Sequence, residues 1–182
     1  MSVLIDSYSE ANGSAWVSIV DADMSGVCQS FKPTKNYTLT SCKFYLTPDG
    51  SPTGNAVAKL YAHTGTFGTT SEPTGSALAT SDNLDVSTIV SAGLKELTFS
   101  TGYILAENIP YVIAIEYLNG DASNFVMVGV DSTSPTHEGN YGLASSGSYT
   151  GDEVFDTLFY VYGDELSPTI DQKYSLPAFK GA

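Results

Sequence analysis

Two histidines, His63 and His137, are the imidazoles that the chain offers for acid–base chemistry, and both occur in Gly-, Ser- and Thr-rich stretches that predict loops. Hydrolysis needs a nucleophile or an acid–base pair whose pKa values are tuned by burial and by neighbouring groups. The sequence contains neither a Gly-x-Ser-x-Gly elbow nor a His-Glu-x-x-His motif. With 20 acidic residues, pairs of carboxylates are inevitable and do not indicate a glycosidase. We therefore expect a protein that is not an enzyme.

Acidic clusters are the remaining candidates for metal ligands. Asp21-Ala-Asp23, the segment Asp82 to Asp85 and Asp152-Glu153 are predicted to place carboxylates on loops, where calcium finds oxygen ligands. None of them has the spacing of an EF-hand loop, so we interpret them as exposed solubilising charge. Zinc would need a Cys/His cluster that the sequence lacks. We expect no cofactor, and calcium stays open as the alternative.

Tyrosines suggest a binding function instead. Lectins with a β-sandwich fold use exposed aromatic rings as flat platforms for sugars, with Asn and Asp nearby for the hydroxyl groups. We single out Tyr61, Tyr141 and Tyr149 as a glycan platform, the last two in a predicted loop over residues 139–151. Tyr37 and Tyr45 are further candidates. The alternative for each tyrosine is packing against a sheet face.

The charge balance limits the classes of partner that the protein can bind. Seven basic residues against 20 acidic ones give a net charge of −13, and all the basic residues are lysines. Nucleic acid is excluded as a partner because its binding requires clustered cations that neutralise phosphates. Anionic membranes are disfavoured for the same reason, and no stretch approaches the roughly 20 apolar residues of a membrane span.

Two turn phrases, Ser51-Pro52-Thr53-Gly54 and Glu72-Pro73-Thr74-Gly75, indicate the scaffold that must position these side chains. Pro presets the first corner of a turn, and Gly accepts backbone conformations that other residues resist. Short segments rich in Val, Tyr, Phe and Thr flank both phrases, as β-strands require. We predict strands at 3–8, 15–20, 27–32, 39–46, 56–62, 77–81, 95–99, 111–117, 125–131 and 154–162.

Alternation of apolar residues predicts which side chains form the core. Residues 39–46 place Cys42, Phe44 and Leu46 on one face, and the run Tyr111–Ile115 is apolar on both faces, which indicates a central strand. We expect Phe44, Leu46, Ile113, Ile115 and either Leu158 or Phe159 in the core. A long polar loop is predicted over 63–76, and 85–91 is the one segment that could form a helix. The expected fold is an all-β, antiparallel two-sheet jelly-roll sandwich.

The N-terminal residues 1–13 lack the basic start and apolar core of a secretory signal, which predicts synthesis as a soluble cytoplasmic polypeptide. Cys28 and Cys42 could form one bridge if their Cβ atoms lay about 4 Å apart. We favour free thiols, because an isolated pair of cysteines is not a disulfide framework.

The succession of strand and turn phrases resembles accessory jelly-roll domains of bacterial surface proteins and phage structural proteins, such as capsid decoration or head-fibre proteins. The resemblance covers about residues 27–163, and the family implies no universal catalytic set. It is carried by 29–31, 39–46, 50–54, 57–62, 73–75, 78–81, 97–99, 111–116 and 156–163.

We therefore expect a jelly roll over 25–163 with an N-terminal segment 1–24 and a C-terminal arm or tail 164–182. The resemblance favours a non-catalytic homo-oligomer that decorates the outside of a phage-type capsid, located on the virion surface. The alternative is a carbohydrate-binding or adhesion module, extracellular or on a cell surface. Apolar residues of the arm are the expected assembly contacts, and packing on its own domain is their alternative: Ile170, Tyr174, Leu176 and Phe179.

Overall fold

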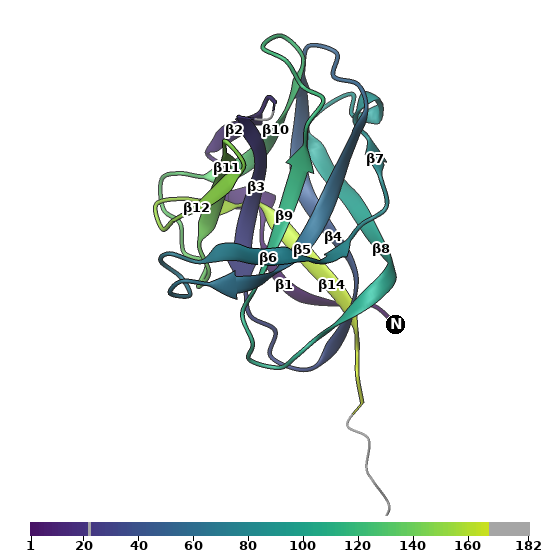
Figure 1. Cartoon of the computed structure of the whole chain (residues 1–182), viewed down its shortest axis with the longest axis vertical. Coiled ribbons are helices and arrows are strands. Elements are labelled where there is room, and N and C mark those ends of the chain that lie inside the picture. Colours follow the sequence, from purple (N-terminus) through teal and green to yellow (C-terminus); the bar gives the residue numbers. More distant parts are fainter. Residues whose placement is uncertain (22, 168–182) are drawn as a thin grey trace, which may run out of the picture.

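Period-two alternation and closely spaced turns produce a molecule of two packed β-sheets. The computed structural model describes residues 1–21 and 23–167, and every strand pair in it is antiparallel (Figure 1). The predicted all-β two-sheet sandwich is thus confirmed. Sheet A contains β1 (Val3–Tyr8), β2 (Ala15–Ile19), β4 (Tyr37–Asp49), β8 (Gly93–Leu105), β10 (Phe125–Asp131), β13 (Asp156–Thr157) and β14 (Phe159–Glu165). Sheet B contains β3 (Met24–Phe31), β5 (Asn55–Thr64), β6 (Glu72–Thr80), β7 (Leu84–Asp85), β9 (Tyr111–Tyr117), β11 (Tyr141–Ser145) and β12 (Ser148–Asp152).

The core lies between the two sheets. Phe44 and Leu46 enter it from sheet A, Ile113 and Ile115 enter it from sheet B, and all four are fully buried. Leu158 and Phe159 are both buried as well, so the predicted core residues are confirmed. Each such side chain contributes roughly 1.5–3 kcal/mol through burial alone.

Strand β9 is central, as its doubly apolar sequence predicts. It pairs with β3 on one side and with β5 on the other, and its residues 111–115 are all buried. Val112 and Ala114 point away from the main core and pack with Cys28 beneath Tyr61 and Tyr149. The outer face of sheet B is therefore covered at its centre.

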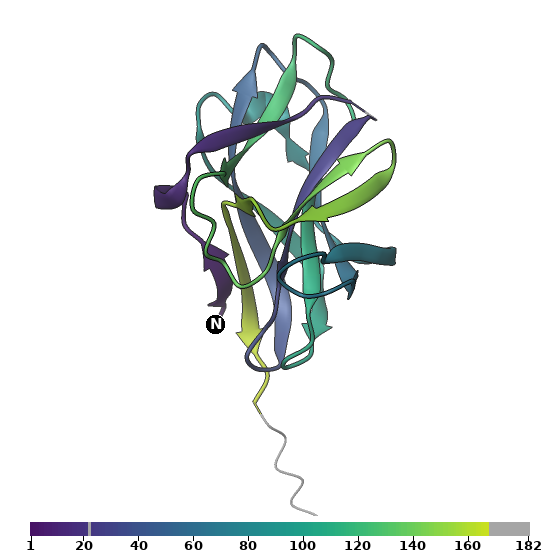
Figure 2. The same cartoon turned by 90° about the vertical axis from the view of Figure 1, so that its left-hand side faces the viewer.

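Sheet B covers this face by curling over it. Figure 1 shows β6 crossing β9 and β3 on the near side, and in Figure 2 β6 and the β11–β12 hairpin project to the same side. The N–H of Gly151 in β12 donates to Glu72 Oε1 in β6 at 3.2 Å. Next to it, the side chain of Asn140 accepts from the N–H of Ser71 at 3.0 Å. The two edges of one sheet thus meet across its own outer face.

Several predicted segments differ from the structure. The polar loop predicted over 63–76 ends early, because residues 72–74 pair with β5 beyond an irregularity between Leu60 and Ala62. The loop predicted over 139–151 is the hairpin β11–β12, whose turn residues Ser146 and Gly147 have φ of 51° and 81°. The strand predicted over 154–162 is divided into β13 and β14 on either side of Leu158. The helix considered over 85–91 is only a 3-10 turn, η2 (Val86–Thr88).

Both terminal segments contribute strands. Strand β1 pairs with β14 and β2 pairs with β10, so residues 1–24 supply two strands of sheet A, linked by the 3-10 turn η1 (Glu10–Asn12). Strand β14 ends at Glu165, inside the segment that the sequence assigns to the arm. The expected assembly contacts Ile170, Tyr174, Leu176 and Phe179 lie outside the described residues.

Cys28 and Cys42 are both buried free thiols. Cys28 lies under the outer face of sheet B, whereas Cys42 belongs to the core between the sheets. Among the described residues, no helix is long and apolar enough to cross a membrane.

Candidate functional site

The structure brings together two of the three tyrosines that the sequence singled out. Tyr61 from β5 and Tyr149 from β12 lie with their ring centroids 6.2 Å apart, at an interplanar angle of 57°. Both rings are half-buried on the outer face of sheet B. Tyr141 is only 5 % exposed and packs in the main core against Phe155. A glycan platform on this surface therefore has to be built without Tyr141.

A shared carboxylate holds the two rings in place. The hydroxyl groups of Tyr61 and Tyr149 donate to Glu116 Oε1 at 2.6 and 3.1 Å, and Lys59 Nζ donates to Glu116 Oε2 at 2.6 Å. The Glu116 side chain is 15 % exposed, so this pairing is shielded from bulk water. The strand register explains the convergence, because Glu116 in β9 lies opposite Val57 in β5, on the same face as Lys59 and Tyr61.

A missing side chain lets Tyr149 reach this carboxylate. Gly26 in β3 is the cross-strand partner of Glu116. A Cβ atom at residue 26 would lie 2.7 Å from the Tyr149 hydroxyl oxygen, which is closer than such contacts allow. Burial, followed for Tyr61 by the hydrogen bond to Glu116, raises the pKa of both tyrosines. Both hydroxyl groups therefore remain protonated donors at neutral pH.

A cleft of about 400 Å³ opens beside the two rings. Its rim is formed by the β11–β12 turn and by the start of β6, and a Cβ atom added at Gly75 or Gly147 would have nothing within 4 Å. Glu72 contributes a carboxylate whose Oε1 accepts from Gly151 and whose Oε2 has no protein donor among the hydrogen bonds of the described residues. We call this site the tyrosine cleft; it is lined by Tyr61, Glu72, Pro73, Gly75, Gly147, Ser148 and Tyr149.

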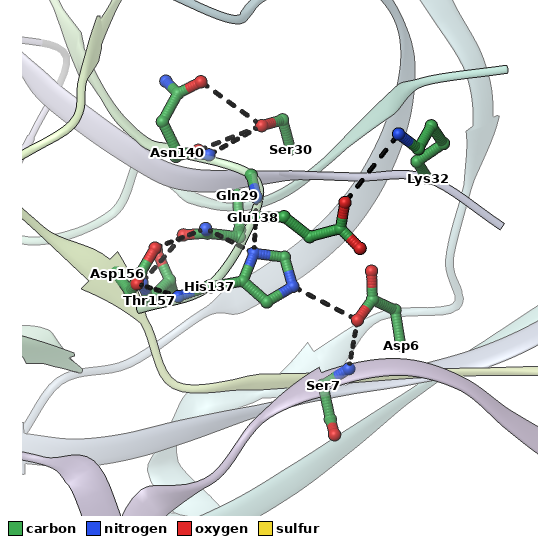
Figure 3. A network of polar contacts seen from close by, with 11 residues as sticks. Asp6, Ser7, Gln29, Ser30, Lys32, His137, Glu138, Asn140, Asp156 and Thr157 are labelled. Atoms are coloured by element: carbon green, nitrogen blue, oxygen red, sulfur yellow. Dashed lines mark hydrogen bonds and ion pairs between the residues drawn. The ribbon is translucent and has the colours of Figure 1, made fainter. Parts of the chain in front are cut away.

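The two histidines lie outside the tyrosine cleft and make structural hydrogen bonds elsewhere in the fold. His137 Nδ1 accepts from the N–H of Gly139 at 3.0 Å and from Gln29 Nε2 at 3.2 Å, so Nε2 carries the proton and faces Asp6 Oδ1 at 3.1 Å (Figure 3). Gln29 also donates to Asp156 Oδ1 at 2.8 Å. This buried network joins β1, β3 and β13, and therefore ties the two sheets together.

His63 is paired with a serine, which is a combination that nucleophilic catalysis uses. Its Nε2 lies 3.0 Å from Ser71 Oγ, and burial lowers the pKa of the imidazole. Ser71 is only 1 % exposed, however, and its hydroxyl also contacts the carbonyl oxygen of Thr66. The geometry therefore fits a structural contact at the base of the 65–71 loop.

Residues 1–21 and 23–167 contain no group of three or more His, Cys, Asp or Glu side chains arranged to hold a metal ion. The sequence analysis left calcium open as a ligand, and the described residues offer no such group to bind it.

Sequence reasoning did not single out Trp16 as a functional residue. It is 41 % exposed in β2 and stacks on Tyr45 of β4, with ring centroids 5.4 Å apart and an interplanar angle of 20°. Two signals were present in the sequence: it is the single tryptophan of the chain, and it alternates with Ala15 and Val17, which face the core.

Comparison with known proteins gives a fold relationship. No protein-family model matches the chain, and no curated protein matches it. Among solved structures, it is similar to one described as "the cysteine protease and lectin-like domains of Cwp84, a surface layer associated protein of Clostridium difficile". The TM-score is 0.57 at 11 % sequence identity, over 91 % of this chain and 36 % of that chain. The chain thus spans about a third of the length of that chain, and at this identity the likeness shows the fold alone.

This structural neighbour supports the resemblance to domains of bacterial surface proteins. These comparisons give no support to the resemblance to phage structural proteins. Decoration of a capsid, location on a virion and homo-oligomerisation stay predictions from the sequence.

Proposed function

We propose that this chain is a non-catalytic carbohydrate-binding domain of a surface protein, and that the tyrosine cleft is its sugar site. The observation that carries the proposal is the convergence of two aromatic rings and the Glu72 carboxylate on one open cleft. Aromatic rings stack on the C–H faces of pyranoses, while carboxylates and hydroxyl groups bond to the sugar hydroxyls. Tyr61, Tyr149, Glu72 and Ser148 supply both kinds of group.

Preorganisation supports this proposal. Glu116 fixes both tyrosine hydroxyls and is itself held by Lys59. Side chains that are already ordered lose little conformational entropy when a ligand binds. A sugar entering the cleft would therefore meet rings that are already in place.

The structural neighbour supports the same function and a surface location. That chain includes a lectin-like domain and belongs to a surface layer associated protein. A jelly-roll fold hosts several functions, so the cleft and not the fold has to carry the choice among them.

Charge selects among glycans. The net charge is −13, no arginine is present, and the two carboxylates near the tyrosine rings, Glu72 and Glu116, would repel an anion. The proposed ligands are therefore neutral sugars or amino sugars, and acidic glycans such as polyuronates are disfavoured.

Titration calorimetry against neutral, amino-substituted and acidic oligosaccharides tests the proposal. Tyr61→Ala and Tyr149→Ala should each weaken binding of a neutral or amino glycan about tenfold, which corresponds to about 1.4 kcal/mol. Tyr162→Ala is the matched control, because Tyr162 is a half-buried tyrosine that stacks on Tyr160 in sheet A. Unchanged affinity in both cleft variants, with circular dichroism showing that they are folded, would overturn the assignment of the site.

A further inference from the structure

Sheet A presents a second aromatic surface on its own outer face. Trp16 in β2 and Tyr45 in β4 stack across the intervening strand β10, where Gly129 is the cross-strand partner of Trp16. A Cβ atom at residue 129 would lie 2.9 Å from Tyr45 Cδ1 and 2.9 Å from Leu158 Cδ1. Glycine at this position therefore leaves the space that the Tyr45 ring occupies.

The indole is exposed in a defined orientation. One of its faces is covered by Tyr45, while 41 % of the residue remains accessible. Beside it lies a pocket of about 300 Å³ whose lining includes Glu10, Ser14, Trp16, Tyr45 and Gly129. We call these five residues the tryptophan shelf. They come from three separate segments of the chain, residues 10–16, β4 and β10, and the shelf therefore forms only in the folded sheet.

A fixed carboxylate stands at the edge of the shelf. Glu10 lies in η1, and its Oε2 accepts a hydrogen bond from the Tyr160 hydroxyl. This bond keeps the pKa of Glu10 below its usual range, so the group is ionised at neutral pH. Its other oxygen, Oε1, has no protein donor among the hydrogen bonds of residues 1–21 and 23–167.

We propose that the tryptophan shelf is a second sugar site, which takes a pyranose ring of a neutral or amino-substituted glycan. The ring would stack on the free side of the indole, and a hydroxyl or ammonium group would donate to Glu10. Charge complementarity favours this class over acidic sugars, because the pocket's charged group is a carboxylate and the chain carries −13. The inference extends the proposed function to another face and does not depend on the tyrosine cleft.

Two sites on the outer faces of opposite sheets have a specific consequence. One domain could contact two glycan strands, or two distant segments of a single strand. Linked sites raise the apparent affinity for a polymer without any new contact, by raising the effective concentration at the second site. Polymers should therefore bind more tightly than their isolated oligomers.

The single tryptophan provides a direct test, because its fluorescence reports only on the shelf. The probes are the trimer of β-1,4-linked N-acetylglucosamine, its deacetylated form, cellotriose and, as an acidic control, trigalacturonic acid. We expect a saturable change of the emission with at least one of the first three sugars. The change should persist in the double variant Tyr61→Ala/Tyr149→Ala and should require at least about tenfold more sugar in Tyr45→Ala.

The outcomes separate the two proposals. A fluorescence change that survives in the cleft variant supports the shelf even where the cleft proposal fails. Calorimetric binding that the cleft variant abolishes, with no emission change in the wild type, overturns the shelf and leaves the cleft standing. If the Trp16 emission spectrum changes with protein concentration and does not change with added sugar, the shelf is a self-association surface. This result would also overturn the proposal. Trp16→Ala, checked by circular dichroism, should lose the same calorimetric component that Tyr45→Ala weakens.

Discussion

The tyrosine cleft and the tryptophan shelf place aromatic rings on the surface in different ways. In the cleft, polar contacts order the rings: Glu116 binds both tyrosine hydroxyls, and Gly26 leaves space for one of them. On the shelf, stacking orders the rings of Trp16 and Tyr45, and Gly129 leaves the space that the Tyr45 ring occupies. The cleft lies between the two edges of the curled sheet B, whereas the shelf lies on the outer face of sheet A. The same fold thus offers one site that depends on a buried charge and one that depends on packing.

Removal of the shared carboxylate should have the largest effect on stability, and the structural change should be confined to the cleft. Glu116→Ala leaves an ammonium group and two hydroxyl groups without their acceptor in a half-buried place. We expect a loss of about 2–3 kcal/mol in the free energy of unfolding, because each bond to a charged group is worth more than a neutral one. Urea denaturation measures this loss.

Glu96→Ala is the matched control for that variant. Glu96 accepts from Ser41 Oγ and lies 3.8 Å from Lys43 Nζ, but its side chain is 52 % exposed. An exposed ion pair contributes only about 0–1 kcal/mol. Equal losses in the two variants would show that the Glu116 cluster is no more than surface charge.

A single methyl group should disturb the shelf by a smaller amount. In Gly129→Ala the new Cβ atom would crowd Tyr45 and Leu158 at 2.9 Å, and overpacking of this kind costs about 1–3 kcal/mol. We expect a lower melting temperature together with a changed Trp16 emission spectrum. Gly93→Ala serves as the control, because its Cβ would have only Lys95 Nζ within 4 Å, at 3.8 Å. A Gly129→Ala protein that matches the Gly93→Ala protein in both properties would contradict the packing argument.

Acid should weaken the contacts of Asp131 beside the shelf, and only at the lowest pH. Burial raises the pKa of Asp131, but hydrogen bonds from the Thr133 N–H, Tyr8 and the Ser134 N–H lower it to about 2 in total. A folded-state pKa below the unfolded value gives stability that is present above about pH 4. This stability is lost as the pH falls through about 2.

The change can be followed through Trp16, since Ser14 donates to Asp131 Oδ1 at 3.2 Å and lines the shelf. Urea midpoints measured by fluorescence from about pH 7 to about pH 2 should fall at the acid end. Asp131→Asn should be less stable at neutral pH and should show a shallower fall. An acid limb of unchanged steepness in the variant would assign it to other carboxylates.

The predictions from sequence succeeded where periodicity decides the outcome. Alternation in β4 placed Phe44 and Leu46 in the core, and the apolar run in β9 marked a central strand, since both depend on local pattern alone. The Tyr61 position also follows from alternation, because Leu60 on its inner side is buried.

Parts of the candidate site could not be predicted from local sequence patterns. The turn Ser146-Gly147 pairs Ser145 with Ser148, and this register turns Tyr141 and Tyr149 to opposite faces of the hairpin. A Ser-Gly hairpin signal could have separated the two tyrosines from sequence. The meeting of Trp16 with Gly129 could not have been predicted in this way, because it depends on a pairing between β2 and β10, which lie far apart in the sequence.

The curl of sheet B also bears on aggregation. Exposed edge strands are templates on which other chains can add a strand, and proteins protect them in several ways. Here the edge strand β12 approaches the other end of its own sheet so closely that a Cβ on Gly151 would lie 2.6 Å from the Ser71 carbonyl oxygen. A foreign strand has little space to enter at this point. The curl that brings the edges of sheet B together therefore also keeps neighbouring copies from joining their sheets there.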